Sequence, residues 1–357
     1  MFRLNDTEEL IKFNSSRLAD SIRGLDKQVE QVFEELAGFD FPDDYKKIQN
    51  VVVCGMGGSG LNMRVFQSLF ASKTKVPTEL INDYTLPAYA NEHTFVLLCS
   101  YSGTTEEILA CSEVAMDRKA KIAYLCAGGT LAEMGEKNGW FGYNFEPKNN
   151  PSKQPRMGLG YAITALLVML AKLGIIENDD VKKETILSAV RDANVRFEER
   201  VGAENNLAKE TALATLDRQA ATVGAEHLKG SAWVMRNQIH ENSKNYANAY
   251  FLPELNHHLL EGLGFPEGVS DKLHFIFIES ENYSRRIKQR FIVTKKILDK
   301  QKIEYSTFCP DQKEPIGEVY ETLIFGSWVS YYLAYLNGID PAPIPFVDLF
   351  KEELSKI

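Results

Sequence analysis

The sequence predicts an α/β protein of two domains, each a parallel sheet flanked by helices in a flavodoxin-like or Rossmann-like three-layer arrangement. Three observations support this fold class. Short apolar runs alternate with stretches of helical periodicity, the pattern occurs twice along the chain, and 357 residues suffice for two domains of ordinary size. Strands that alternate with helices in this way form parallel sheets with right-handed crossovers.

The first domain is predicted over residues 1–176. Its first fifty residues have helical character and lead into the run VVVC at 51–54, which is typical of a strand buried on both faces. Further strands are predicted at 78–81, 94–100 and 121–127, and helices at about 61–70, 105–116 and from Gly160 onward.

A charged helical stretch over 177–216 has no strand pattern and is predicted to connect the domains. The second domain, 217–357, is predicted to repeat the strand–helix pattern, with strands near Thr222, at 273–280 and at 303–308 and a last long helix ending at Asn337. The segments HTFVLLCSYSGTTEEILACS and LHFIFIESENYSRRIKQRFI share a strand, a polar loop and a helix, but the hydroxyl-rich loop occurs only in the first. We therefore expect an anion site in the first domain alone.

Composition narrows the class of protein. The formal net charge of −9 argues against a general nucleic-acid binder, which carries a basic face. The N-terminus lacks the apolar core of a signal peptide, and the longest apolar stretch, 161–176, is too short and too interrupted to span a bilayer. Five cysteines without a C-x-x-C spacing indicate a reducing compartment. We expect a cytoplasmic protein without membrane or nucleic-acid partners.

A glycine-rich turn, GMGGSG, follows the strand at 51–54 and precedes a helix. Glycine permits a tight turn and the close approach of a ligand, and a helix N-terminus presents unpaired N–H groups. Gly57, Gly58 and Ser59 are therefore candidate ligand-binding residues. Gly55, Gly57 and Gly60 also spell the dinucleotide fingerprint G-x-G-x-x-G, and the glycines of a plain tight turn are the structural alternative.

A second loop, SYSGTT, follows the predicted strand 94–100 and opens the next helix. Ser100, Ser102 and Thr105 are candidates to hold a phosphate through their hydroxyls, together with backbone N–H groups and the helix dipole. Helix capping is the alternative, but a cap needs one hydroxyl, whereas this loop has four in six positions. A small phosphorylated ligand between two helix starts accounts for both loops better than a dinucleotide does.

Together, GMGGSG and SYSGTTEE resemble the sugar isomerase (SIS) domain, in which a serine-rich loop holds a sugar phosphate. The chain departs from the usual family pattern at Thr104, where asparagine is common, and at Ala342, where threonine is common. From about residue 50 to the end, four further segments resemble the bifunctional phosphoglucose/phosphomannose isomerases: PSKQPRMGLGY (151–161), HENSKNYA (240–247), PELNHH (253–258) and GIDPAPIPFVDLFKEEL (338–354).

This resemblance implies an aldose–ketose isomerase that interconverts glucose 6-phosphate, fructose 6-phosphate and mannose 6-phosphate without a metal or an organic cofactor. Such a reaction needs a base that moves a proton between carbons 1 and 2, and a carboxylate whose pKa is raised by burial suits this role. Glu241 in HENSK matches the base of the family. A histidine suits the opening of the sugar ring because its pKa is near neutral, and His257 in PELNH matches the family residue.

Two cations complete the site that the resemblance implies. A guanidinium stabilises the negative charge of an enediolate, and Arg156 matches the arginine of the family. Lys351 matches a family lysine near the ring oxygen, with complementation of a helix dipole as its structural alternative. No H-x-x-x-H or H-E-x-x-H spacing indicates a metal site. In the family the ring-opening histidine comes from the neighbouring chain, so the resemblance also implies a homodimer.

Two other functions stay open at the level of sequence. SIS domains also occur in non-catalytic sugar-phosphate regulators. Such a regulator would keep the serine loop but have no use for Glu241 or His257, and it would usually carry a DNA-binding segment. No DNA-binding segment is apparent in this sequence. The interpretation as a nucleotide-dependent dehydrogenase depends on the glycine fingerprint alone, and a failure of the protein to bind NAD would exclude it.

Overall fold

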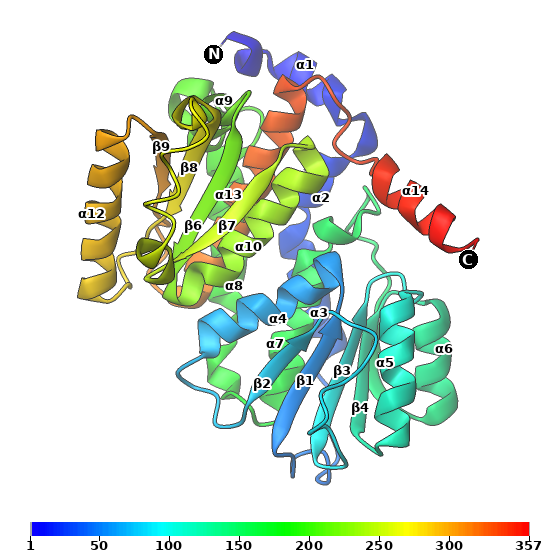
Figure 1. The fold of residues 1–357 in the computed structure, drawn as a ribbon. Coiled ribbons are helices and arrows are strands. Elements are labelled where there is room, and N and C mark those ends of the chain that lie inside the picture. Colours follow the sequence, from blue (N-terminus) through cyan, green and yellow to red (C-terminus); the bar gives the residue numbers. More distant parts are fainter. Residues whose placement is uncertain (1, 357) are drawn as a thin grey trace.

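The computed structural model describes residues 2–356 and contains two sheets with helices packed between them (Figure 1). The first sheet has the strand order β2-β1-β3-β4-β5 and the second the order β7-β6-β8-β9. Every strand pairing is parallel, which confirms the predicted fold class. The strands are β1 (Asn50–Gly55), β2 (Thr78–Ile81), β3 (Thr94–Ser100), β4 (Lys121–Cys126), β5 (Phe141–Asn144), β6 (Gln219–Ala225), β7 (Ala247–Leu252), β8 (Leu273–Ile278) and β9 (Glu304–Phe308).

Helices cover both faces of the first sheet because alternate residues of each buried strand point to opposite sides. Val51 and Val53 of β1 join the core that contains α3, α4 and α7, whereas Val52 and Cys54 join a second core with α5 and α6. The helices of this half are α1 (Thr7–Phe13), α2 (Leu18–Arg23), α3 (Leu25–Glu35), α4 (Gly57–Phe70), α5 (Glu106–Asp117), α6 (Gly129–Asn138) and α7 (Leu159–Lys172).

The second half is built around α13, whose residues after Pro315 are all buried. This helix packs against α8, α9 and α10, and α10 packs in turn against α4 of the first half. One apolar core therefore runs through both halves. The helices are α8 (Lys183–Phe197), α9 (Leu207–Thr215), α10 (Lys229–Gln238), α11 (Val269–Lys272), α12 (Arg285–Lys300), α13 (Pro315–Leu336) and α14 (Pro345–Leu354).

The stretch 177–216, predicted as a connection, forms α8 and α9, and α8 packs against both α13 and α3. Helix α4 begins at Gly57 rather than near Leu61, so the glycine turn is partly helical. Helix α6 and strands β5 and β7 were not predicted. Both missed strands are sheet edges, where one side of the strand has no neighbour and the apolar pattern is correspondingly weak.

The sequence led to expectations about membrane-spanning segments and about the cysteines. Within residues 2–356, no helix is both long enough and apolar enough to cross a membrane. All five cysteines are free thiols, four of them buried.

Candidate active site

Two helix starts meet at the carboxyl ends of β1 and β3, the adjacent strands at which the chain order of the first sheet reverses. Among the described residues, no side chain caps the start of α4 or that of α5, which leaves backbone N–H groups available for an anion. Glycine is required at Gly55 and Gly60 because strand and helix approach so closely: a Cβ atom on Gly60 would lie 2.7 Å from the Gly55 carbonyl oxygen.

The hydroxyl-rich loop after β3 is organised by hydrogen bonds among its own residues. The Ser100 and Thr105 hydroxyls lie 2.8 Å apart, and the Gly103 N–H donates to Ser100 Oγ over 3.0 Å. Ser102 Oγ accepts from the N–H of Thr104 and is exposed. Since the Thr105 hydroxyl contacts Ser100 and does not cap α5, simple capping does not explain the loop.

The two loops contact each other and a third segment. The Tyr101 N–H donates to Ser59 Oγ over 3.0 Å, which joins the loops after β1 and β3. On the other side, Gly58 lies against the backbone of Arg156, where an added Cβ atom would approach the Arg156 Cα to 3.4 Å. We call Gly57, Gly58, Ser59, Ser100, Ser102 and Thr105 the cradle.

Arg156 lies in the short 3-10 turn before α7, and its side chain is only 1% exposed. All five of its N–H groups are directed at acceptors. Nε donates to Asn242 Oδ1 at 2.6 Å, and Nη2 donates to the carbonyl oxygens of Pro341 and Ala342, each at 2.8 Å. Nη1 donates to the side chains of Gln154 at 2.9 Å and Glu241 at 3.4 Å. Ala342 contributes its carbonyl here, and this contact does not depend on the threonine side chain common in the family.

Glu241 lies in a π-helical turn, Ile239–Ser243, that continues α10 and carries the carboxylate toward the first half of the molecule. Its side chain is 28% exposed, and burial raises the pKa of its carboxyl group. The positive charges of Arg156, Lys244 and Lys351 oppose that rise. A partly buried carboxylate with a raised pKa, in contact with a fixed guanidinium, is suited to accept and return a proton.

Two residues of this cluster were not predicted as site residues. Asn242 accepts the hydrogen bond from Arg156 and donates to Ser330 Oγ over 3.0 Å, which fixes the amide between α10 and α13. Lys244 donates to the carbonyl oxygens of Glu241 at 2.8 Å and Pro341 at 3.1 Å, and burial lowers its pKa to about 8. Both belong to the HENSK segment, so the motif was the available signal.

The remaining predicted residues lie outside this cluster. Lys351 is exposed on α14, close enough for its charge to lower the pKa of Glu241 but without a direct contact among the described residues. His257 is exposed in the 3-10 turn Glu254–His257 after β7, and no hydrogen bond or ion pair joins it to the described part of the chain. The structure thus brings together the cradle, Arg156 and Glu241 within one chain, but not His257.

Known proteins share this architecture. Residues 204–354 match the family model described as the bacterial phospho-glucose isomerase C-terminal SIS domain. A hypothetical protein of Thermus thermophilus superposes with a TM-score of 0.75 at 16% identity, covering 98% of this chain and 93% of the other. A glucose-6-phosphate isomerase of Chlamydia trachomatis has a TM-score of 0.69 at 14% identity, covering 95% and 77%. The fold and the family model together identify a protein of the SIS class.

Relatives of higher identity narrow this class to one family. The chain is 30% identical over 343 residues to the bifunctional phosphoglucose/phosphomannose isomerase of Caldicellulosiruptor bescii, covering 95% of this chain and 99% of the relative. It is 29% identical over 341 residues to that of Aquifex aeolicus, covering 92% and 99%. The chain belongs to the bifunctional phosphoglucose/phosphomannose isomerase family, as its motifs indicated, and is a sugar-phosphate isomerase.

Proposed function

We propose that the enzyme converts both glucose 6-phosphate and mannose 6-phosphate into fructose 6-phosphate, and the reverse, through an enediolate and without a metal. The observation that carries this proposal is the contact between Glu241 and the buried Arg156 beside Gly58 of the cradle. This arrangement supports a role for the cradle in holding the phosphate while the far end of the sugar reaches the carboxylate.

In this mechanism Glu241 takes the proton from carbon 2 of the aldose and returns it to carbon 1. Burial supports this role because a carboxylate with a raised pKa is a stronger base when ionised and a competent acid once protonated. Action on both epimers requires in addition that the pocket accept either configuration at carbon 2.

Arg156 acts on the enediolate through its charge and not through a spare hydrogen bond. Its N–H groups are engaged by protein acceptors, so the guanidinium is held in place before substrate arrives. A fixed cation of this kind needs no reorganisation as negative charge develops on the sugar oxygens. Lys351 adds a second positive charge on the side of α14.

We further propose that His257 opens the sugar ring in the active site of a partner subunit. Strand β7 begins just after Glu241 and spans six residues, which at the usual strand rise is about 17 Å, and His257 lies beyond its far end. Within one chain this strand lies between the two residues, which supports an active site shared between subunits. Proton transfer requires hydrogen-bond contact with the substrate.

Exposed apolar side chains support a symmetric dimer. Phe346 on α14 is 83% exposed, and Phe265, in the loop that follows His257, is 85% exposed. In a two-fold dimer, a contact between α14 of one chain and the 258–268 loop of the other occurs twice, and it would bring each His257 toward the partner site. The apolar face of α14 consists of Phe346, Val347, Leu349, Phe350 and Leu354.

One coupled assay tests the substrate assignment. Purified enzyme is incubated separately with glucose 6-phosphate and mannose 6-phosphate, and fructose 6-phosphate is measured in each case. We expect product from both. Product from only one epimer would restrict the enzyme to a single activity. Full activity after treatment with a chelator is expected as well, and recovery of activity only on addition of zinc would contradict the metal-free route.

A further inference from the structure

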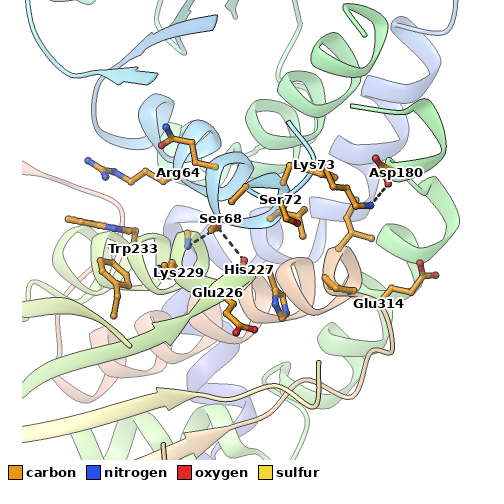
Figure 2. A pocket seen from close by; sticks show the side chains of 18 of the residues that line it. Arg64, Ser68, Ser72, Lys73, Asp180, Glu226, His227, Lys229, Trp233 and Glu314 are labelled. Atoms are coloured by element: carbon orange, nitrogen blue, oxygen red, sulfur yellow. Dashed lines mark hydrogen bonds and ion pairs between the residues drawn. The ribbon is translucent and has the colours of Figure 1, made fainter. Parts of the chain in front are cut away.

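A large cavity lies between the two halves of the molecule, away from the cradle (Figure 2). Its volume is about 720 Å³, within the range of small-molecule sites. The last two turns of α4, from Arg64, and the residues after them form one side, and the loop after β6 with the start of α10 forms the other. Ser68 joins the two sides, because its hydroxyl donates to the His227 carbonyl at 3.2 Å and accepts from the Gly230 N–H at 3.1 Å.

This cavity is the internal counterpart of the candidate active site. In the first half, the loop after β1 leads into α4, and the end of α10 supplies Glu241 to that loop. In the second half, the loop after β6 leads into α10, and the end of α4 faces that loop. Strands β6 and β8 are the neighbours at which the chain order of the second sheet reverses, where parallel sheets commonly bind ligands.

The counterpart differs from the candidate active site in its side chains. At its switch point the buried carboxylate of Glu318 contacts His227 and accepts hydrogen bonds from Ser280 at 2.7 Å and Asn282 at 3.0 Å. The Ser280 hydroxyl follows β8 much as the cradle hydroxyls follow β3, and it is already hydrogen-bonded to Glu318. Where the π-helical turn after α10 carries Glu241, the residues after α4 include Ser72 and Lys73, neither of which is a carboxylate. No carboxylate therefore takes the place of Glu241 at the end of α4.

The charges of the lining favour an anion. Four side chains of the lining are cationic and three are acidic. Lys73 is paired with Asp180 and Lys182 with Glu314, and Glu226 accepts a hydrogen bond from the Ser284 N–H. The two other cations, Arg64 and Lys229, form no ion pair with the described residues. Four cations against three acids leave the lining with a net charge of +1, which favours an anion such as a phosphate monoester.

The aromatic wall of the cavity excludes a stacked base. The guanidinium carbons of Arg64 and Arg236 lie 4.2 Å and 4.1 Å from the centroid of the Trp233 ring. The Phe251 ring also packs on this indole, with the two ring centroids 5.6 Å apart, so protein groups already cover the ring on which a nucleobase would stack. A ligand of the cavity is therefore not held by stacking on this residue.

We propose that this cavity is a second ligand site, which binds a small, non-aromatic phosphate monoester. The site is separate from the cradle, yet α4 and α10 each extend from the cavity to the candidate active site. Gly230 marks their close crossing, since a Cβ atom there would lie 2.5 Å from the Val65 Cα. A ligand in the cavity thus contacts the two helices that carry the cradle and Glu241.

Binding stoichiometry tests the proposal. Glycerol 2-phosphate is titrated into the full-length protein by calorimetry, with three matched variants that each add one carboxylate: Lys229→Glu in the cavity, Ser102→Asp in the cradle and Lys137→Glu at an exposed position of α6. We expect two ligands per chain for the parent and for Lys137→Glu, one for each of the other single variants, and none for their combination. A glutamate in the first turn of α10 is favourable to the helix, so Lys229→Glu should fold.

Two further variants keep the test independent of one substitution. Ser72→Trp is designed to fill the cavity from an exposed turn and should also leave one ligand. Lys229→Met should weaken one of the two binding events about tenfold, the loss expected for one charge-assisted hydrogen bond. A parent that binds a single ligand, lost in Ser102→Asp and kept in Lys229→Glu, would overturn the proposal. Failure of the proposed cradle has a different result: Ser102→Asp would still bind two ligands.

Discussion

Mixing two inactive variants, Glu241→Gln and His257→Ala, should restore isomerase activity if His257 serves the active site of its partner. The expectation follows from β7, whose six residues, about 17 Å at the usual strand rise, lie between the turn that carries Glu241 and the turn that carries His257. The amide of Glu241→Gln cannot accept the proton, and we expect a loss of at least about 10²-fold in turnover. His257→Ala removes the ring-opening group from every site of its own homodimer.

The size of the recovery follows from symmetry. Free exchange in an equal mixture makes about half of the dimers mixed, and each mixed dimer has one site with both an intact Glu241 and an intact His257. The other site of the mixed dimer lacks both groups. The mixture should therefore reach about one quarter of the parent activity.

The assay is coupled detection of fructose 6-phosphate, with subunit exchange followed by native mass spectrometry. His258→Ala is the matched control, because His258 is the neighbouring histidine, is exposed and pairs with Glu254. Its activity should equal that of the parent. If mixed dimers form and the mixture remains inactive, His257 does not act across the interface and the reasoning from β7 is refuted.

Three more substitutions test the site within one chain. Ser102→Ala combined with Thr105→Ala should weaken sugar-phosphate binding by about 1–3 kcal/mol for each hydroxyl while the fold persists, and an unchanged KM would contradict the cradle. Glu241→Gln should keep sugar-phosphate binding, measured by calorimetry, although turnover is lost; parent-like turnover would assign the base to another carboxylate. Activity of the parent should fall as the pH drops through the raised pKa of Glu241, because only the carboxylate is a base. Lys244→Met removes a positive charge that lowers this pKa, so the acidic limb of kcat/KM should move to higher pH, whereas Lys137→Met should leave it in place.

The parts of the fold that the sequence predicted are those in which local chemistry and tertiary position agree. Strands β1 and β3 are buried on both faces and consist of nearly uninterrupted apolar residues, so their position is evident from the pattern. The glycine turn and the hydroxyl loop were recognisable because a helix start next to a strand end requires such residues. Edge strand β7 was missed although it decides how far His257 lies from Glu241, since its ANAYFL sequence is only half-buried.

The sequence by itself determined the two-sheet α/β class, the family and the residue types available for acid–base chemistry, because these depend on periodicity and on motifs that are contiguous in the chain. Tertiary structure alone decided which of these residues meet. Arg156 and Glu241 are 85 positions apart, and only the packing of α4 against α10 brings the turn before α7 to the end of α10. The same packing of α4 against α10 explains two further features. It surrounds the Arg156 guanidinium with acceptors, and it forms the cavity at the opposite end of the helix pair. Each of these features forms where segments that are distant in the sequence pack together, and such packing cannot be predicted from a local sequence pattern.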